Sequence, residues 1–322
     1  MKILTAVLLN CAFSATVAAQ GAASWPDRPV RVVVPAPPGS SLDIIVRTVG
    51  DKLKDRWKQP LVVDNKAGAG GMLGMDAVAK AAPDGYTLGI GFNGPIAFGP
   101  FMYKKMPYSP ERDLLPVVLT TSQPNVLAVA AGNPANTVAE LVAWAKAQGT
   151  KLSYGSVGNG SSSHLTMELF KSQAGFDAVH VPYSGSPPAA TSLAANETQM
   201  LFAVAPALLP LIQGGRIKFI AASSAQRMDG MKSLPTLAES GYPGFEALAW
   251  NGLFAPAGTP PEVVARINAD VNAALKEPSV REALAKQGLI VGGGTPAEFK
   301  AFIDSEARVW GAIIRKVGIS VD

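Results

Sequence analysis

The stretch VRVVVPAPPGSSLDIIV, residues 30–46, decides the fold class. Its first five residues are β-branched apart from one arginine, as in a buried strand, and the proline, glycine and serine residues that follow end the strand. From Ile44 onward, apolar side chains recur on one face of a helix, through Val49 to Leu53. A strand, a loop and a helix in this order form the repeating unit of an α/β fold.

The same unit recurs along the rest of the chain. We predict strands at residues 61–64 and 87–92, with a helix over residues 72–81 between them. The pattern then restarts, with expected strands at residues 125–130, 152–154, 179–183, 200–204 and 217–222 and expected helices at residues 137–148, 164–173 and 187–196. Strands that alternate with helices predict mainly parallel sheets.

The restart near residue 125 indicates a second lobe, and a chain of 322 residues has the length of two domains. Extended crossovers near residues 123–127 and 247–252 suit a hinged clamp, with lobe one formed by residues 24–125 plus 249–322 and lobe two by residues 126–248. Thr259 and Thr295 each precede a proline and stand three residues before a glutamate, which is the spacing of a helix N-cap. We expect the helices that follow them to return to lobe one.

The N-terminus has the composition of a secretory signal peptide. Lys2 is followed by a mostly apolar run to Val17 and then by small residues, so we assign residues 1–23 to the signal peptide, with cleavage after Ala19 or Ala23. Cys11 is the only cysteine, so the mature chain would contain none. No later stretch of 18 apolar residues predicts a membrane span. We expect an exported, soluble protein located in the periplasm.

The charge balance argues against a nucleic-acid partner. The chain has 28 Lys and Arg residues against 24 Asp and Glu residues, a net charge of +4, and no run of five basic residues. A charge this small, spread over this length, predicts no nucleic-acid-binding surface.

Two loops rich in glycine and serine form the candidate binding site. Residues 36–41 and residues 155–163 each follow a strand and open a helix. Glycine lets a ligand approach the backbone, serine hydroxyls donate hydrogen bonds, and free N–H groups at a helix start favour an anion. Ligands of open α/β sheets bind at the carboxyl ends of strands, where both loops fall. The alternative is that both loops are ordinary helix N-caps.

A serine hydrolase is the first enzymatic alternative. Its nucleophile motif Gly-x-Ser-x-Gly is incomplete, because Ser156 is followed by Gly158 but preceded by Tyr154 where a glycine belongs. His164 and His180 are the only histidines that could serve as a base, and we interpret both as structural or pocket-lining. We therefore expect no catalytic residue.

Cofactor and metal sites are also disfavoured. Gly89 to Gly94 matches the dinucleotide pattern Gly-x-Gly-x-x-Gly, but Pro95, Gly99 and Pro100 argue against the helix that should follow. Two histidines sixteen positions apart and no mature cysteine do not make a usual zinc site. We expect no cofactor and no bound metal.

Three further side chains each allow two interpretations. Asp43 and Arg47 have the spacing of an ion pair within a helix, yet Asp43 could equally meet an amino or hydroxyl group of a ligand. Phe92 and Tyr183 each end a strand beside a loop that contains glycine, so they either form the wall of a pocket or pack in the core.

From Trp25 to the C-terminus the chain resembles the Bug-type extracytoplasmic solute receptors, the binding proteins of tripartite tricarboxylate transporters. The blocks that carry the resemblance are residues 26–35, 68–71, 79–88, 158–165, 179–183 and 252–261. The resemblance implies a periplasmic-binding-protein-like fold, in which two α/β lobes close on a small solute. It also implies that a ligand carboxylate is held between the two loops, which contain no Lys or Arg.

Carried over by position, the resemblance implies a specific set of ligand-binding residues. They are Ala36, Ser40, Ser41 and Asp43, then Phe92, Asn93 and Gly94, and in lobe two Ser156, Asn159, Gly160, Ser161, Ser162, His164 and Tyr183. The family usually has an aromatic residue at Ala36 and two glycines at Ser40 and Ser41, so the resemblance does not identify the ligand.

Together these observations predict a periplasmic receptor without catalytic activity. It would capture a small carboxylate in the cleft between the lobes, most simply as a monomer, and deliver it to the membrane subunits of a transporter. A binding protein that reports its ligand to a signalling partner, and an exported serine hydrolase, are the alternatives.

Overall fold

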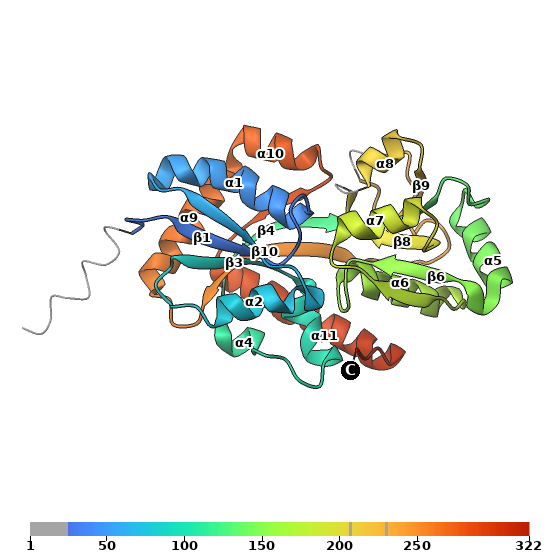
Figure 1. The fold of residues 1–322 in the computed structure, drawn as a ribbon, viewed down its shortest axis with the longest axis horizontal. Coiled ribbons are helices and arrows are strands. Elements are labelled where there is room, and N and C mark those ends of the chain that lie inside the picture. The colour runs from blue at the N-terminus through green and yellow to red at the C-terminus, as the bar shows by residue number, and fades with distance from the viewer. Residues whose placement is uncertain (1–24, 206–207, 229–230, 322) are drawn as a thin grey trace, which may run out of the picture.

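Two α/β lobes lie side by side in the computed structural model, which describes residues 25–205, 208–228 and 231–321 (Figure 1). The signal peptide predicted for residues 1–23 lies outside these ranges. The sheet of the first lobe has the order β11-β4-β10-β3-β1-β2, with β1 at Val30–Val34, β2 at Leu61–Asn65, β3 at Thr87–Phe92, β4 at Leu114–Pro124, β10 at Leu248–Pro256 and β11 at Ile290–Gly293. The sheet of the second lobe has the order β7-β6-β8-β5-β9, with β5 at Val126–Ala130, β6 at Ser153–Ser156, β7 at Val179–Pro182, β8 at Met200–Ala203 and β9 at Ile217–Ala222.

Both sheets are mixed. Parallel pairs join β1 to β2 and β3, and β6 to β7 and β8. In contrast, β10 runs antiparallel to β3 and β4, β11 to β4, and β5 to β8 and β9. The α/β fold class is confirmed, but the sheets are not mainly parallel. Strands β5 and β10 come from the other lobe without an intervening helix, so they are not bound to the parallel direction that a strand–helix–strand connection imposes.

The helices predicted at residues 72–81, 137–148, 164–173 and 187–196 are present within two residues of those bounds, and α3, α4, α8 and α10 were not predicted. The first lobe contains α1 at Ser41–Trp57, α2 at Met72–Ala79, α3 at Gly99–Met102, α4 at Pro110–Asp113, α9 at Pro261–Lys276, α10 at Pro278–Ala285, α11 at Pro296–Val317, and the short turns η1 at Ala69–Gly71 and η2 at Gly94–Phe98. The second lobe contains α5 at Val138–Gln148, η3 at Gly149–Lys151, α6 at Ser162–Ala174, α7 at Ser186–Ala194 and α8 at Leu209–Gln213.

Two strand connections join the lobes. Strand β4 leads into β5 with only Asn125 between them, and β10 begins at Leu248, immediately after Ala247 of the second lobe. These are the extended crossovers that the sequence predicted. Helix α11 also packs against α6 of the second lobe, and its C-terminal end reaches the boundary between the lobes (Figure 1).

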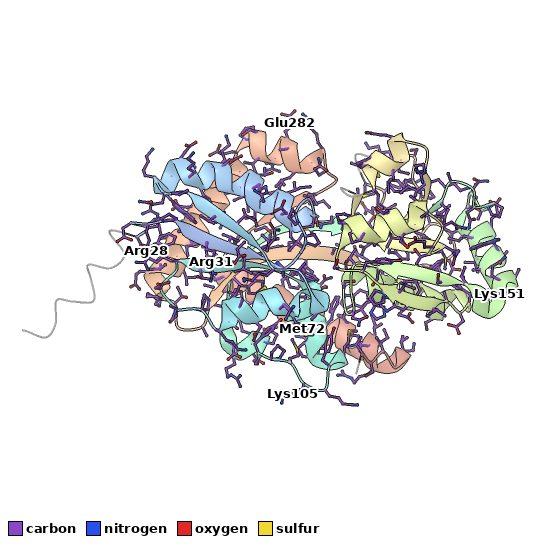
Figure 2. The ribbon with its side chains drawn as sticks, viewed as in Figure 1. Arg28, Arg31, Met72, Lys105, Lys151 and Glu282 are labelled. Carbon is purple, nitrogen blue, oxygen red and sulfur yellow. The ribbon has the colours of Figure 1, made fainter. Side chains whose placement is uncertain are left out.

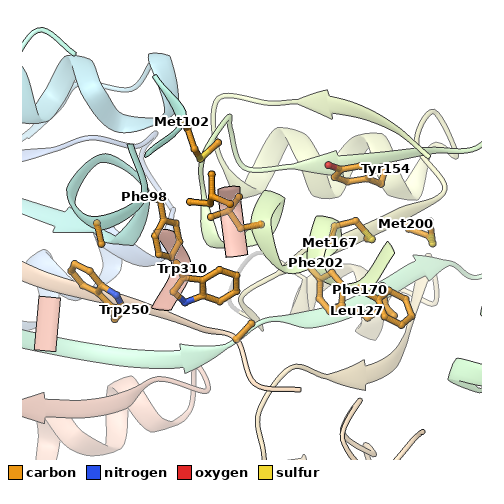
Figure 3. Close-up of a cluster of buried hydrophobic side chains, with 14 of the residues drawn as sticks. Phe98, Met102, Leu127, Tyr154, Met167, Phe170, Met200, Phe202, Trp250 and Trp310 are labelled. Carbon is orange, nitrogen blue, oxygen red and sulfur yellow. The ribbon is translucent and has the colours of Figure 1, made fainter. Parts of the chain in front are cut away.

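One buried cluster crosses this boundary (Figure 3). On the first lobe's side, the rings of Phe98 and Trp310 lie 5.3 Å apart. On the other side, Leu127, Met167 and Phe202 belong to the same cluster and are fully buried. Each such side chain contributes about 1.5–3 kcal/mol when it is removed from water. The two lobes therefore share part of their core beside the hinge.

Two local predictions were wrong, each for a physical reason. Helix α9 begins at Pro261 without the predicted N-cap at Thr259, because Pro260 precedes a second proline and keeps an extended backbone, so that Pro260 itself occupies the N-cap position. The Thr259 hydroxyl donates to the carbonyl of Pro256 at 2.8 Å. The corresponding cap at Thr295 is present, with both hydrogen bonds of a capping box. Pro95 does not prevent a helical turn at η2, because proline is tolerated where the backbone N–H has no helical partner.

Candidate ligand-binding cleft

A cleft of about 420 Å³ lies between the lobes, within the size range of small-molecule sites. First-lobe residues on its walls include Ala36, Leu42, Met72 and Phe92, and second-lobe residues include Val157, Pro182 and Val204. Met72 lies at the boundary between the lobes, while the labelled charged side chains Lys105, Lys151 and Glu282 lie on the periphery (Figure 2). The walls are thus largely apolar, with polar groups at particular points.

Two long helices start at this cleft with the same cap. Ser40 caps α1 by accepting a hydrogen bond from the backbone N–H of Asp43 at 3.3 Å. Ser161 caps α6 by accepting from the N–H of His164, also at 3.3 Å. Both caps line the cleft. The remaining N–H groups of the two first turns have no partner within their helices, so they and the helix dipoles favour an anion between them.

Two shorter helices start at the same cleft. Met72 begins α2 and Ser186 begins α7, and both residues line the cleft. The second and third residues of α7 are Pro187 and Pro188, which have no N–H to donate. The start of α7 therefore offers fewer N–H donors to an anion than the starts of α1 and α6.

No charged side chain among the described residues lines the cleft. Asp43, predicted either as an ion pair or as a ligand contact, is not part of its lining and bonds Arg47 at 3.0 Å. Burial would raise the pKa of Asp43, but hydrogen bonds from Arg47, the Gly39 N–H and Asn65 outweigh it and hold the pKa below its ordinary value. The ion pair with Arg47 is present, and through the bond from Gly39 Asp43 orders the loop before α1, while a ligand contact at Asp43 stays a prediction.

The predicted site residues divide into two groups. Those that line the cleft are Ala36, Ser40, Ser41, Phe92, Asn93, Asn159, Ser161, Ser162 and Tyr183. Those that do not are Asp43, Gly94, Ser156, Gly160 and His164. Residues of the second group either stabilise the loops that line the cleft or contact the opposite lobe.

Hydrogen bonds of Ser156, Gly160 and His164 stabilise the second-lobe loop at residues 155–163. His164 Nδ1 accepts a hydrogen bond from the Gly160 N–H at 3.1 Å, and Ser156 Oγ lies 2.6 Å from His180 Nε2. The two imidazole rings stack with centroids 3.9 Å apart. Burial, followed by the neighbouring His180, lowers the pKa of His164 to about 3, and burial, followed by the charge of Lys171, lowers the pKa of His180 to about 4. Both rings are therefore neutral near pH 7, which His164 requires to accept the bond from Gly160.

The loops of the two lobes touch across the mouth of the cleft. Gly70 has a left-handed backbone, with φ at +62°, and a Cβ added there would lie 2.3 Å from the carbonyl oxygen of Asn159. A Cβ at Gly94 would lie 2.8 Å from the carbonyl oxygen of Gly160. The structure therefore represents a closed clamp, whose seam depends on the absence of side chains at these positions.

The aromatic residues Phe92 and Tyr183 both line the cleft, as the pocket-wall interpretation predicted. The Tyr183 hydroxyl is hydrogen-bonded to Ser192, and the Phe92 ring faces the backbone of Gly71. Each ring is therefore held in place at the wall by its own lobe.

Other cleft residues were missed from the sequence. Residues 68–72 line the cleft after β2, and they repeat the strand-then-glycine pattern of the predicted loops, which could have revealed them. Gln123, Asn125 and Asn251 line its floor, where the crossover strands pass between the lobes. Their only sequence signal was the presence of amides in or beside the crossover strands.

The pair Ser156 and His180 has the distance of a catalytic dyad but not its exposure. Ser156 is fully buried and is not part of the cleft lining, and its hydroxyl also bonds the backbone of Gly158. Among the described residues, His180 has no hydrogen bond to a carboxylate that would orient it as a base. The glycines of the dinucleotide-like pattern are also accounted for by packing, since a Cβ at Gly91 would lie 2.7 Å from Phe254.

The described residues also bear on other classes of protein. Within residues 25–205, 208–228 and 231–321, no helix has the length and apolarity needed to cross a bilayer. The same part of the chain contains no group of three or more His, Cys, Asp or Glu residues placed to hold a metal ion. The expectation of no metal and no cofactor remains a prediction.

Comparisons with known proteins agree with this geometry. Residues 45–319 match the family model described as tripartite tricarboxylate transporter family receptor. Protein BugT of Bordetella pertussis is 35% identical over 318 residues, which cover 98% of each chain. The structure of R. palustris Rpa4515 with adipate has a TM-score of 0.90 at 35% identity and covers 92% of this chain and 100% of that one.

A second solved structure carries a different small acid. MatC (Rpa3494) from Rhodopseudomonas palustris with bound malate has a TM-score of 0.85 at 31% identity, covering 90% of this chain and 100% of that one. The family model spans most of the chain, and the curated relative spans nearly all of it. The chain therefore belongs to the tripartite tricarboxylate transporter receptor family, the Bug-type solute-binding proteins, as its sequence resemblance predicted.

Proposed function

We propose that this protein is a periplasmic receptor that binds a small carboxylate between its lobes and delivers it to the membrane subunits of a tripartite transporter. The observation that carries the proposal is the pair of serine-capped helix starts, at Ser40 and Ser161, which face one cleft without a charged side chain among the described residues lining it. Helix N-termini and hydroxyls bind an anion without needing a cation.

The relatives support a carboxylate as the anion. Adipate and malate accompany two solved structures that share the fold and about a third of the sequence. Both are small organic acids, which a 420 Å³ cleft can enclose. Delivery to a transporter rests on the family, whose description names a tripartite transporter.

We propose a clamp that hinges at residues 124–126 and 247–248, between lobe one at residues 24–125 plus 249–322 and lobe two at residues 126–248. The ligand is captured while the lobes are apart, and the contact of Gly70 with Asn159 then seals the mouth. We propose a monomer as the working unit, because the two lobes of a single chain together enclose the cleft.

Isothermal titration tests the proposal against mono-, di- and tricarboxylates, amino acids and aromatic acids at pH 7. We expect at least one carboxylate to bind with micromolar or tighter affinity. In Ser162→Phe, the ring would fill the space at the start of α6, so that binding is lost. The matched control is Ser305→Phe on the exposed face of α11, which should bind as the wild type does. Failure of every acid to bind, with the protein folded, would remove the proposal.

Hydrolysis is the second candidate, because Ser156 Oγ lies 2.6 Å from His180 Nε2. The burial of Ser156 argues against it, since a nucleophile must reach the substrate. Ester turnover that disappears in Ser156→Ala would favour hydrolysis over the receptor.

A further inference from the structure

A second hollow, of about 660 Å³, lies at the far end of lobe two, and we call it the distal groove. It is formed by the end of β5 and the turn after it, the C-terminal ends of α5 and α7, and the turn before β9. Figure 2 shows Lys151, one of its lining residues, at the outer tip of this lobe. In the described part of the chain, the distal groove shares no lining residue with the cleft, so a molecule bound in it would leave the cleft open.

The distal groove is positively charged. Lys151 and Arg216 line it, and no acidic side chain of the described residues does. Lys151 has no hydrogen bond or ion pair with a described residue, and the Arg216 guanidinium has one bond, from Nη2 to the carbonyl of Ala194 at 3.4 Å. The C-terminal ends of α5 and α7 attract cations to this place, but that bond uses only one of the five N–H groups of the guanidinium. The remaining donors of both cations are available to an anion.

Uncharged side chains of the groove add two further kinds of contact. The carboxamides of Gln148 and Asn196 are exposed and have no hydrogen bond to a described residue. Trp144 of α5 packs partly against the buried cluster and also lines the groove, so part of its indole is accessible to a bound molecule. A carboxamide both donates and accepts hydrogen bonds, whereas an indole offers a broad apolar face. The distal groove therefore combines positive charge, polar groups of both kinds and one aromatic surface.

We propose that the distal groove binds a sugar that carries a negative charge, as a phosphate or as a carboxylate. The two cations pair with the anionic group, and the planar guanidinium of Arg216 can hold two of its oxygens. Sugar hydroxyls donate and accept, which matches both atoms of each unbonded carboxamide. The C–H face of a sugar ring packs on an indole. An aromatic anion would use the cations and the indole but leave the amides to water, and a bare phosphate would use the cations alone.

Trp144 makes binding in this groove visible by fluorescence. The chain has five tryptophans, and the other four are at most 5% exposed, so acrylamide quenches mainly Trp144. Glucose 6-phosphate and glucuronate are titrated into the whole protein, beside glucose, phenyl phosphate and inorganic phosphate. We expect at least one charged sugar to lower the quenching constant about two-fold and to bind about ten-fold more tightly than each reference compound. If neither charged sugar protects Trp144 at millimolar concentration, or if the reference compounds bind equally well, the inference is overturned.

A double variant assigns the binding to the two cations. Lys151→Ala combined with Arg216→Ala should weaken binding of the charged sugar by about ten-fold or more, because the charge-assisted hydrogen bonds are lost. The matched control is Lys54→Ala combined with Arg281→Ala, which removes the same charge from exposed positions of lobe one and should bind as the wild type does. Circular dichroism melts verify that both variants are folded. Equal affinity in the two double variants would refute a site at the distal groove.

A variant of the cleft separates this site from the proposed receptor function. Ser162→Phe, which fills the cleft, should bind the charged sugar as the wild type does, because Ser162 does not line the distal groove. If sugar binding disappears in Ser162→Phe and survives in the Lys151 and Arg216 double variant, the sugar occupies the cleft and the distal-groove inference fails while the receptor stands. If no carboxylate binds in the cleft but a charged sugar protects Trp144, the receptor proposal fails and the distal groove stands.

Discussion

Gly70→Ala tests whether the seam between the lobes controls ligand affinity. The added Cβ would lie 2.3 Å from the carbonyl oxygen of Asn159, whereas ordinary contact begins at 3.4 Å, so the overlap is 3.4 − 2.3 = 1.1 Å. The atom it meets is backbone of the opposite lobe, and it cannot turn aside as a side chain would. The lobes must separate by about that distance, and the full closure seen here is lost.

The size of the effect follows from the cost of overpacking. Forcing a methyl group into a well-packed contact costs about 1–3 kcal/mol, and this penalty falls on the closed state alone. Each 1.4 kcal/mol weakens an affinity about ten-fold, so we expect Gly70→Ala to raise the ligand Kd by about 5- to 140-fold. The left-handed backbone at this position adds strain to the open and closed states alike.

Two measurements check this expectation. Isothermal titration gives the Kd, and small-angle scattering with saturating ligand should report a larger radius of gyration than for the wild type. Gly215→Ala is the matched control, because its φ of +64° carries the same strain while an added Cβ meets nothing within 4 Å. If Gly70→Ala is folded and binds and closes as the wild type does, the seam does not limit closure, and the reasoning is refuted.

Three other perturbations have defined outcomes. His164→Leu cannot accept the bond from Gly160 and should weaken ligand binding by about ten-fold, close to one buried hydrogen bond, whereas His164→Asn should retain most of the affinity. Folding lowers the pKa of His164 to about 3 and of His180 to about 4, so below pH 6.5 the unfolded chain binds more protons than the folded one. The free energy of unfolding should therefore fall by about 1.4 kcal/mol per pH unit per histidine as the pH drops from 6.5 toward 4. Urea titrations that show no such loss would contradict neutral rings in the folded protein. Trp310→Ala should lower the free energy of unfolding by about 3–5 kcal/mol in denaturant titrations, because the cavity opens beside Phe98 in the shared core; a loss below 1 kcal/mol would mean that the cluster contributes little there.

The local units of the fold were readable from the sequence because they depend on neighbouring residues. The strand at Val30–Val34, the loop after it and the helix from Ser41 follow from side-chain spacing and turn residues within seventeen positions. Long-range pairing was not readable. Strand β10 pairs with β3 and β4, more than a hundred positions away, and no local pattern states its direction. Two threonines with the same spacing, Thr259 and Thr295, differ because Thr259 is followed by two prolines, the first of which stays extended, whereas Thr295 is followed by one.

The site residues divide in the same way, into those that neighbouring residues reveal and those that only long-range strand pairing brings together. Ser40 and Ser161 were found because a cap, a glycine and a helix start are adjacent in sequence. Gln123, Asn125 and Asn251 were missed because isolated amides carry no spacing pattern, and only the crossing of the strands brings them together. Asp43 and Gly94 were placed in the site by position, whereas the former serves its own loop and the latter contacts the opposite lobe.

The uncharged lining of the cleft has a consequence for how a ligand leaves. Were an arginine or lysine to bind the anion, its departure would strand a buried cation, at a cost of several kcal/mol. Here the described lining contains no such group, and a departing acid leaves behind only hydroxyls and backbone N–H groups, which water can satisfy. If the acid is held as proposed, its departure requires no counter-ion to replace it and no change in the protonation of a lining side chain.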